Sequence, residues 1–195
     1  MPVGRPRQFD CDRALQSAMR VFWSKGYEGA SLEELTRAMG INRPSLYAAF
    51  GSKRRLFDKA MEKYGQGPGA YVKCAMDLPT ARESIAALMY GAIDLMTDRH
   101  NPAGCVLVSG ALSCGKGLEP VKRDLASRRA EVEALIAKRL RRGVREGDLP
   151  LGTDAAAMAR YIATVQFGLS VQASGGVGRA KLRAVARQAL GVFPR

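Results

Sequence analysis

Apolar residues recur along this chain with the period of an amphipathic α-helix, from the first segment to the last. The first segment begins after Asp10, a good helix cap, and has apolar residues at i, i+3, i+4 and i+7 counted from Leu15. It is predicted to stop at Gly26. No segment convincingly alternates apolar and polar residues as a half-buried strand would. The pattern therefore predicts an all-α protein.

Two short helices are predicted next, on either side of a tight turn at Gly40. The sequence SLEE, which starts at Ser31, has the form of a capping box. The inward positions of the helix that it starts are Leu32, Leu35, Ala38 and Met39. Asn42 can cap the second short helix, and Pro44 fits its first turn, where no amide donor is needed. Two short helices that follow a longer bracing helix form a helix-turn-helix pattern.

A further helix starts at Ser52, which can cap it, and runs to Tyr64. The segment after it reads GQGPGAYVKCAMDLPTA, and its content of Gly and Pro predicts a bend or a loosely structured connection. We therefore expect an N-terminal helix-turn-helix domain over residues 1–64 and a larger helical domain over residues 65–195.

Five more helices are predicted in the second domain, over residues 81–99, 104–115, 118–146, 153–174 and 179–193. Thr153 is the expected cap of the fourth of them, which carries almost no charge after Arg160. A second copy of the chain could cover this helix, so we expect a homodimer with a four-helix interface that includes the last helix. Burial of the same helix inside its own subunit is the alternative.

The formal net charge of +13 favours a polyanionic partner, either nucleic acid or an anionic membrane surface. The longest uncharged run spans 18 residues, 161–178, but Thr, Gln and Ser interrupt it, so a membrane span fits poorly. The start of the chain has no apolar leader segment. We therefore expect a cytoplasmic protein with no membrane partner.

The second short helix has the residue types that read double-stranded DNA. A recognition helix presents its N-terminal residues to base edges in the major groove, and the candidates for base contacts are Arg43, Pro44, Ser45 and Ala48. An arginine pairs with guanine through two hydrogen bonds, whereas proline and alanine can contact a thymine methyl group. Phosphate contacts are expected at helix starts and outward polar positions, namely Ser31, Tyr47, Ser52 and Lys53. The alternative is a helical domain with an ordinary basic surface.

The leading sequence VGRPR suggests a second reader of DNA. Arg5 and Arg7 flank a proline in a narrow cationic arm, which suits insertion into an A·T-rich minor groove. A solubilising tail is the alternative for this short motif.

Residues 4–64 resemble the DNA-binding domain of TetR-family transcriptional regulators. The resemblance rests on GRPRQFD, SLEELTRAMGI and SLYAAFGSK. It implies an all-α homodimer whose second domain binds a small-molecule effector and provides dimerisation, and in which effector binding moves the two DNA-reading heads apart. It also matches Tyr47 and Lys53 to phosphate contacts and residues 43–48 to the recognition helix.

An effector pocket in a helical bundle is lined mainly by apolar groups with a few polar ones. The candidates are Met89, Tyr90, Met96, Cys105, Ser109, Tyr161 and Phe167. Some relatives in the family sense electrophiles through thiols, so Cys105 is also a candidate redox sensor, with an inert packing role as its alternative. On one helix, Cys105 and Cys114 would face opposite sides and could not form a disulfide within a subunit.

The residues contain no combination of nucleophile, base and orienting group, no metal cluster and no phosphate loop. We therefore expect no enzyme and no cofactor, but a ligand-responsive DNA-binding regulator that acts as a repressor and leaves its operator when a small effector binds. One alternative is a structural, sequence-tolerant DNA-coating protein. Another is a regulator that senses electrophiles or redox state through a thiol.

Overall fold

The computed structural model describes residues 9–112, 115 and 117–193, and all regular structure within these ranges is helical. The predicted all-α class is confirmed. In chain order, the helices are α1 (Cys11–Gly29), α2 (Leu32–Met39), α3 (Arg43–Phe50), α4 (Lys53–Gln66), the 3-10 turn η1 (Pro68–Ala70), α5 (Tyr71–Met76), α6 (Ala81–Met96), α7 (Val106–Leu112), α8 (Glu119–Glu146), α9 (Ala155–Ser174) and α10 (Arg179–Gly191).

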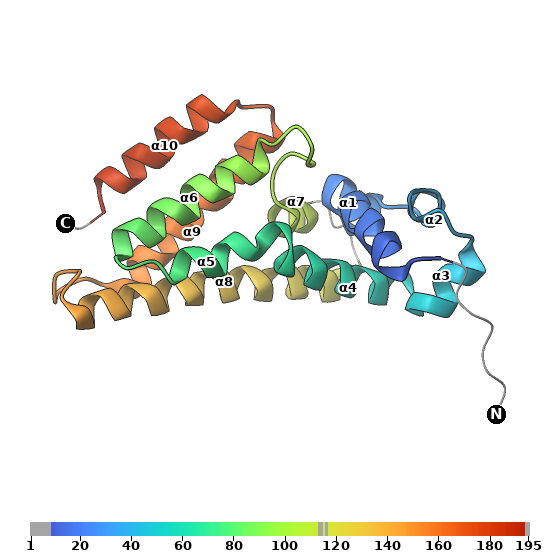
Figure 1. The fold of residues 1–195 in the computed structure, drawn as a ribbon, viewed down its shortest axis with the longest axis horizontal. Coiled ribbons are helices and arrows are strands. Elements are labelled where there is room, and N and C mark those ends of the chain that lie inside the picture. The colour runs from blue at the N-terminus through green and yellow to red at the C-terminus, as the bar shows by residue number, and fades with distance from the viewer. Residues whose placement is uncertain (1–8, 113–114, 116, 194–195) are drawn as a thin grey trace.

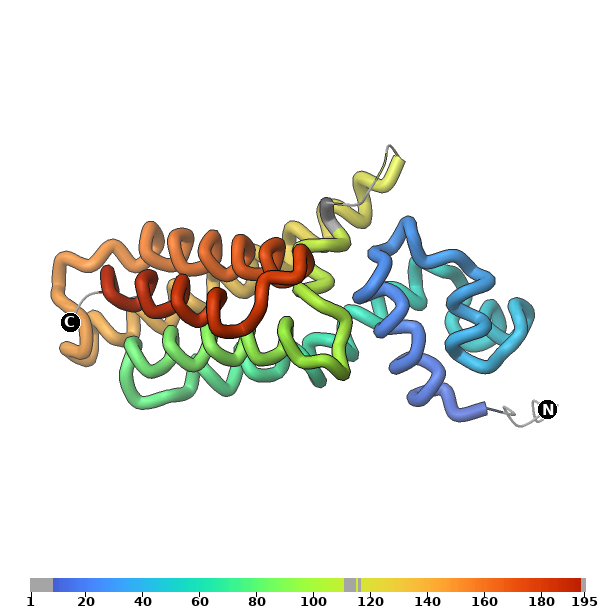
Figure 2. The backbone as a smooth tube through the Cα atoms, turned by 90° about the horizontal axis from the view of Figure 1, so that it is seen from above, coloured from blue at the N-terminus to red at the C-terminus, as the bar shows by residue number. Residues whose placement is uncertain are grey.

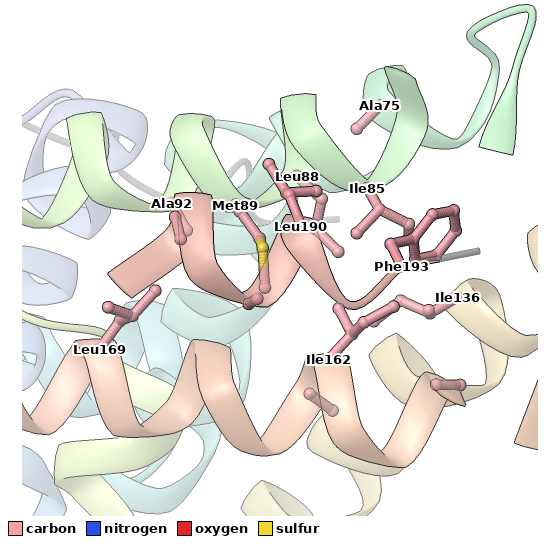
Figure 3. Close-up of a cluster of buried hydrophobic side chains, with 14 of the residues drawn as sticks. Ala75, Ile85, Leu88, Met89, Ala92, Ile136, Ile162, Leu169, Leu190 and Phe193 are labelled. Atoms are coloured by element: carbon pink, nitrogen blue, oxygen red, sulfur yellow. The ribbon is translucent and has the colours of Figure 1, made fainter. Parts of the chain in front are cut away.

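The molecule is elongated, with α1, α2 and α3 at one end and α6, α9 and α10 toward the other (Figure 1). Helix α4 leads from the first group toward the second, and the long helix α8 runs along the bundle (Figures 1 and 2). Two clusters of buried apolar residues correspond to these groups. The larger cluster lies among α5, α6, α8, α9 and α10, and Figure 3 shows part of it.

The smaller cluster joins the first four helices but does not end with them. Val106 at the start of α7 and Val121 and Leu125 in α8 belong to the same buried cluster as residues of α1 and α4. The expected division between residues 64 and 65 falls inside α4, and the packing of the first group continues across it.

The regular helical backbone of α1 breaks at Gly26, where its end was predicted: Gly26 has a φ of 71° and a ψ of -178°, which suit glycine, and a further helical turn continues to Gly29. Several other local predictions need correction. Residues 65–80 are not a loose connection, because α5 buries Ala75 and Met76. In α2, Ala38 is exposed and Thr36 is buried instead, where its hydroxyl donates to the Leu32 carbonyl at 2.9 Å.

Two helix ends also differ from prediction. The cap of α9 is Asp154, whose carboxylate accepts from the amides of Ala156 and Ala157 at 3.0 Å, and not Thr153. Helix α6 ends at Met96, followed by Thr97, where a helix to residue 99 was expected. The hydroxyl of Thr97 donates to the Ile93 carbonyl at 2.7 Å, which completes the last turn.

The loop between α5 and α6 is fixed to α8 by one buried arginine. Arg139 is only 3% exposed, and its guanidinium donates to the Ser84 hydroxyl at 2.8 Å and to the carbonyls of Leu78 and Pro79 at 3.1 and 2.9 Å. The Asp148 carboxylate lies 3.7 Å away. These contacts hold the start of α6, and with it one wall of the larger core, against α8.

Arg139→Ala should lower the free energy of unfolding by about 2 to 4 kcal/mol, because the Pro79 carbonyl and Ser84 lose their donor and Asp148 its cation, while Leu78 keeps the donor of Arg142. Urea denaturation followed by circular dichroism, at one fixed protein concentration, measures the change. Lys138→Ala is the matched control, since Lys138 is the exposed neighbour on the same helix. Equal stability of the two variants would show that the buried arginine does not stabilise the fold.

Candidate nucleic-acid interface and ligand cavity

The turn between α2 and α3 is fixed by caps at both helices. The Ser31 hydroxyl accepts from the Glu34 amide at 3.1 Å, and the Glu34 carboxylate accepts from the Ser31 amide at 3.3 Å, so both halves of the predicted capping box are present. Gly40 ends α2 with a φ of 67°, a conformation that favours glycine. The Asn42 side chain accepts from the Ser45 amide at 2.9 Å and starts α3. These local contacts define the crossing of two short helices that a helix-turn-helix requires.

Aromatic side chains of α1 pack against α4, and the core that they form supports α2 and α3. Phe22 meets Phe57 edge to face with ring centroids 5.1 Å apart, and Trp23 meets Tyr64 in the same way at 4.9 Å. Leu46 of α3 is fully buried in the same cluster. The inner face of α3 is therefore held firmly, and its opposite face is free for a partner.

The predicted base-contact residues share that opposite face. Arg43, Pro44 and Ala48 are exposed, and Ser45 is half-buried. Tyr47, predicted to contact phosphate, is 46% exposed on the same helix. Arg43 forms no ion pair with any residue in the described ranges. The helix thus offers an unpaired cation, a phenol hydroxyl and small apolar groups side by side, which suits a DNA groove.

The start of α4 forms a second anion-binding element. The Ser52 hydroxyl accepts from the Arg55 amide at 3.1 Å, and Lys53 occupies the first helical position. The Lys53 ammonium lies 4.7 Å from the centroid of the Tyr27 ring, and burial lowers its pKa while Glu28 raises it. Helix dipole, capping hydroxyl and ammonium thus lie together, as phosphate binding requires.

Arg54, the basic residue that follows Lys53, is directed away from this anion-binding element. Its guanidinium pairs with Asp58 at 2.8 Å and with Asp124 of α8 at 3.6 Å. It therefore joins the two groups of helices. The arm residues Arg5 and Arg7 lie outside the described residues.

A cavity of about 180 Å³ lies where α4 meets the second group of helices. Its lining is mainly apolar and comes from α4, η1, α5, α6, α7, α8 and α9. The lining residues are Met61, Tyr64, Gly65, Gly69, Tyr71, Val72, Lys73, Met96, Cys105, Leu107, Val108, Arg128, Glu131, Val132, Leu135, Gln166 and Phe167. Such a mainly apolar cavity with a few polar groups is typical of a small-molecule site.

Three predicted pocket residues, Met96, Cys105 and Phe167, border this cavity. The other four lie elsewhere. Met89 is buried in the larger core (Figure 3), and Tyr90 lies under the Arg183 guanidinium at 5.4 Å. Ser109 donates to the Cys105 carbonyl at 3.0 Å, and Tyr161 is exposed on α9.

Sequence reasoning missed Tyr64, Tyr71 and Gln166 as cavity residues. One signal could have found Gln166, because it is, with Ser170, one of two polar residues on the mainly apolar inner face of α9. Neither tyrosine carries such a signal, because an aromatic residue at a helical core position is usually packing.

Cys105 borders the cavity in its protonated state. Burial raises the pKa of its thiol, while a hydrogen bond from the Tyr64 hydroxyl, with the oxygen 3.5 Å from the sulfur, acts in the opposite direction. A thiol reacts through its thiolate, so this environment slows reaction with electrophiles. Cys114, the other member of the pair considered above, lies outside the described residues.

The arrangement of α1 to α4 defines a helix-turn-helix DNA-binding protein, and comparison with known proteins identifies its family. Residues 14–60 match the family model for bacterial regulatory proteins of the tetR family, and residues 81–190 match the tetracyclin repressor-like C-terminal domain. The chain is 31% identical to the HTH-type transcriptional repressor ComR of Escherichia coli (strain K12), over 98% of this chain and 92% of that protein.

Two solved structures are also similar. A cysteine mutant of the TetR family transcriptional regulator CifR, complexed with 26 bp double-strand operator DNA, is 47% identical, with a TM-score of 0.94 over 97% of this chain and 100% of that chain. A TetR regulator from Rhodococcus sp. RHA1 is 39% identical, with a TM-score of 0.64 over 95% and 100%. The chain belongs to the TetR family of transcriptional regulators, DNA-binding proteins that are not enzymes. No helix in the described part of the chain is long and apolar enough to cross a membrane.

Arg43→Ala should reduce affinity for a selected operator by about 1 to 3 kcal/mol and relax the base preference at one position of each half-site, because a bidentate contact to guanine is lost. Fluorescence anisotropy with the operator and its single-base variants measures both effects.

Lys53→Ala is the contrasting variant. It should weaken binding to all sequences alike and lower the slope of log affinity against log salt by about 1, since a phosphate contact carries no base information. An unchanged base preference in Arg43→Ala would show that α3 is misplaced as the recognition helix. Arg187→Ala, an exposed cation on α10, should change neither property.

Proposed function

We propose that this chain is a cytoplasmic repressor that binds operator DNA as a homodimer and leaves the operator when a small molecule occupies the cavity beside α4. The DNA-binding domain would comprise residues 1–64 and the effector-binding and dimerisation domain residues 65–195. The name of the relative ComR as a repressor and the operator complex of CifR support this proposal. The exposed face of α3 supports it independently.

The observation that carries the proposal is that one helix contributes residues to both candidate sites. Met61 and Tyr64 of α4 line the cavity, and Lys53, a candidate phosphate contact, begins the same helix. Met61 lies eight residues after Lys53, a rise of about 12 Å. A ligand that displaces Met61 or Tyr64 would therefore move the phosphate-binding end of α4 and, through the shared core, the recognition helix.

An ion-pair chain gives a second connection between the two sites. The Asp124 carboxylate lies 3.2 Å from the Arg128 guanidinium and 3.6 Å from that of Arg54. Arg128 lines the cavity, and Arg54 is the residue after Lys53. Any movement of α8 around a ligand would be felt at the start of α4. An effector of this kind needs only about 1 to 3 kcal/mol of preference for the DNA-incompetent state.

The outer face of α9 supports a dimer. Its exposed positions recur at helical spacing and carry no charge from residue 161 on, as in Tyr161, Thr164, Gly168 and Val171. Val185 on the neighbouring helix α10 is 50% exposed. A two-fold dimer through these helices would present two copies of α3 to two half-sites of one operator.

Selection of bound fragments from random DNA tests the proposal. We expect an inverted repeat whose half-site centres lie about one helical turn of DNA, 34 to 36 Å, or a multiple of it apart. A DNA-coating protein, the alternative from a different class, would enrich no motif, because phosphate contacts carry no sequence information. A single unrepeated motif would contradict the dimer while leaving sequence-specific binding in place.

Val171→Asp should shift the protein from dimer to monomer, because it places a charge in an interface that is expected to be apolar. Sedimentation velocity at micromolar concentration measures the assembly, and circular dichroism confirms that the fold persists. Leu151→Asp is the matched control, since Leu151 is 91% exposed in the loop before α9. A monomeric wild type, or a Val171→Asp variant that remains dimeric, would contradict this interface. Phe167 is unsuitable for the test because it borders the cavity.

A further inference from the structure

One polar group beside the cavity lacks a hydrogen-bond partner. Gln166 is only 5% exposed, and its side-chain nitrogen donates to the Tyr71 hydroxyl at 3.2 Å. Its side-chain oxygen is buried and has no hydrogen-bond partner among the described residues. Among the described residues, four other buried side-chain atoms share this property, and all are arginine nitrogens in residues that do not border the cavity. A buried polar group without a partner costs free energy, so this glutamine favours a ligand that supplies one.

Tyr71 adds a donor next to that acceptor. Burial raises the pKa of its phenol well above the usual range, with Cys105 acting in the same direction, so the hydroxyl keeps its proton at neutral pH. The hydroxyl accepts from Gln166, which leaves its own proton available to a third group. If the Gln166 amide is turned over, Tyr71 donates to the amide oxygen and the amide nitrogen becomes the unpaired group. A hydroxyl on a ligand both donates and accepts, so it fits either orientation.

The charged groups of the lining do not offer a site for an ion. The Arg128 guanidinium is paired with Asp124 at 3.2 Å, and Lys73 and Glu131 are exposed to solvent. A ligand ammonium would meet no buried carboxylate in the described lining, and a ligand carboxylate would have to compete with Asp124 for Arg128, so desolvation of either charge would oppose binding. The lining favours an uncharged ligand.

The volume limits the size of that ligand. An apolar cavity of about 150 Å³ accommodates benzene in another protein, and the cavity here measures about 180 Å³. A molecule of roughly six to ten non-hydrogen atoms would therefore fill it without a change in the surrounding helices.

We propose that the cavity selects small, uncharged, mainly apolar molecules that carry one hydroxyl group, and that this hydroxyl binds between Gln166 and Tyr71. The inference rests on the proposed function only in treating this molecule as the effector. Ligand choice is a property of the DNA-free protein and can be measured without the operator.

Three probes of similar size separate the parts of the proposal: benzyl alcohol, toluene and benzoate. Titration calorimetry on the DNA-free wild type should give a dissociation constant for benzyl alcohol about tenfold lower than for toluene. Benzoate should not bind detectably in the same concentration range. Toluene binding as tightly as benzyl alcohol would overturn the role of the hydroxyl, and benzoate binding as tightly would overturn the preference for uncharged ligands. Absence of binding by all three would overturn the proposal as a whole.

Two variants assign the preference to the named residues. Gln166→Met keeps the side-chain length but removes both polar atoms, so benzyl alcohol and toluene should bind with similar affinity. Tyr71→Phe removes the phenol hydroxyl and should reduce the tenfold preference for benzyl alcohol over toluene. This second variant keeps the test valid if thermal denaturation shows that Gln166→Met is not stably folded. Gln16→Met, at an exposed position on α1, should keep the wild-type preference. Retention of that preference in folded Gln166→Met or Tyr71→Phe would overturn the assignment.

Operator release is then measured separately, with benzyl alcohol added to the protein bound to its selected operator. Release together with hydroxyl-dependent binding supports both conclusions. Hydroxyl-dependent binding without release would retain the ligand class and contradict the effector role in the proposed function. If toluene, added in the same way, released the operator as effectively as benzyl alcohol, the effector role would be retained and the ligand class contradicted.

Discussion

The packing of α1 against α4 is the interaction on which both sites depend. Phe22 and Trp23 of α1 contact Phe57 and Tyr64 of α4 through edge-to-face aromatic pairs, which bury large areas and fix the angle between the helices. The Trp23 indole also donates to the carbonyl of Gly104 at 3.0 Å, so α1 is anchored to the chain just before α7. This helix pair supports the proposed recognition helix, and Met61, Tyr64 and Gly65 of α4 form one wall of the cavity.

This shared packing explains why a ligand in the second group of helices could influence DNA binding without a separate relay. Residues of α7 and α8, among them Val106 and Leu125, complete the buried cluster of the first group. A close-packed interior changes between discrete arrangements more readily than it deforms gradually. Under the proposed function, displacement at the cavity would reposition α2 and α3 together with α4, and the short turns at their caps would keep the helix-turn-helix intact during such a movement.

The caps and the exposed face of the candidate DNA-contact residues could be predicted from sequence because local chemistry defines them. Caps act within three residues, as at Ser31, Asn42 and Ser52, and the outer face of α3 follows from the inward positions of Leu46 and Phe50. The cavity depends on how several helices meet. Met89 and Met96 share one face of α6, yet only Met96 borders the cavity. Whether a residue on this face reaches the cavity depends on its position along α6 relative to α4 and α7. The burial of Arg139 and the helical form of α5 likewise depend on distant partners.

The thiol beside the cavity is better understood as part of its wall than as a reactive sensor. Cys105 is linked to α4 through the Tyr64 hydroxyl and to α9 through its backbone amide, which donates to the Ser170 hydroxyl at 2.8 Å. Burial raises the pKa of the thiol, so a ligand in the cavity would contact a neutral sulfur. A neutral, polarizable sulfur suits apolar contact. We therefore expect reversible contacts to govern occupancy of the cavity, with the hydrogen-bonding needs of Gln166 as the main source of selectivity within a mainly apolar site.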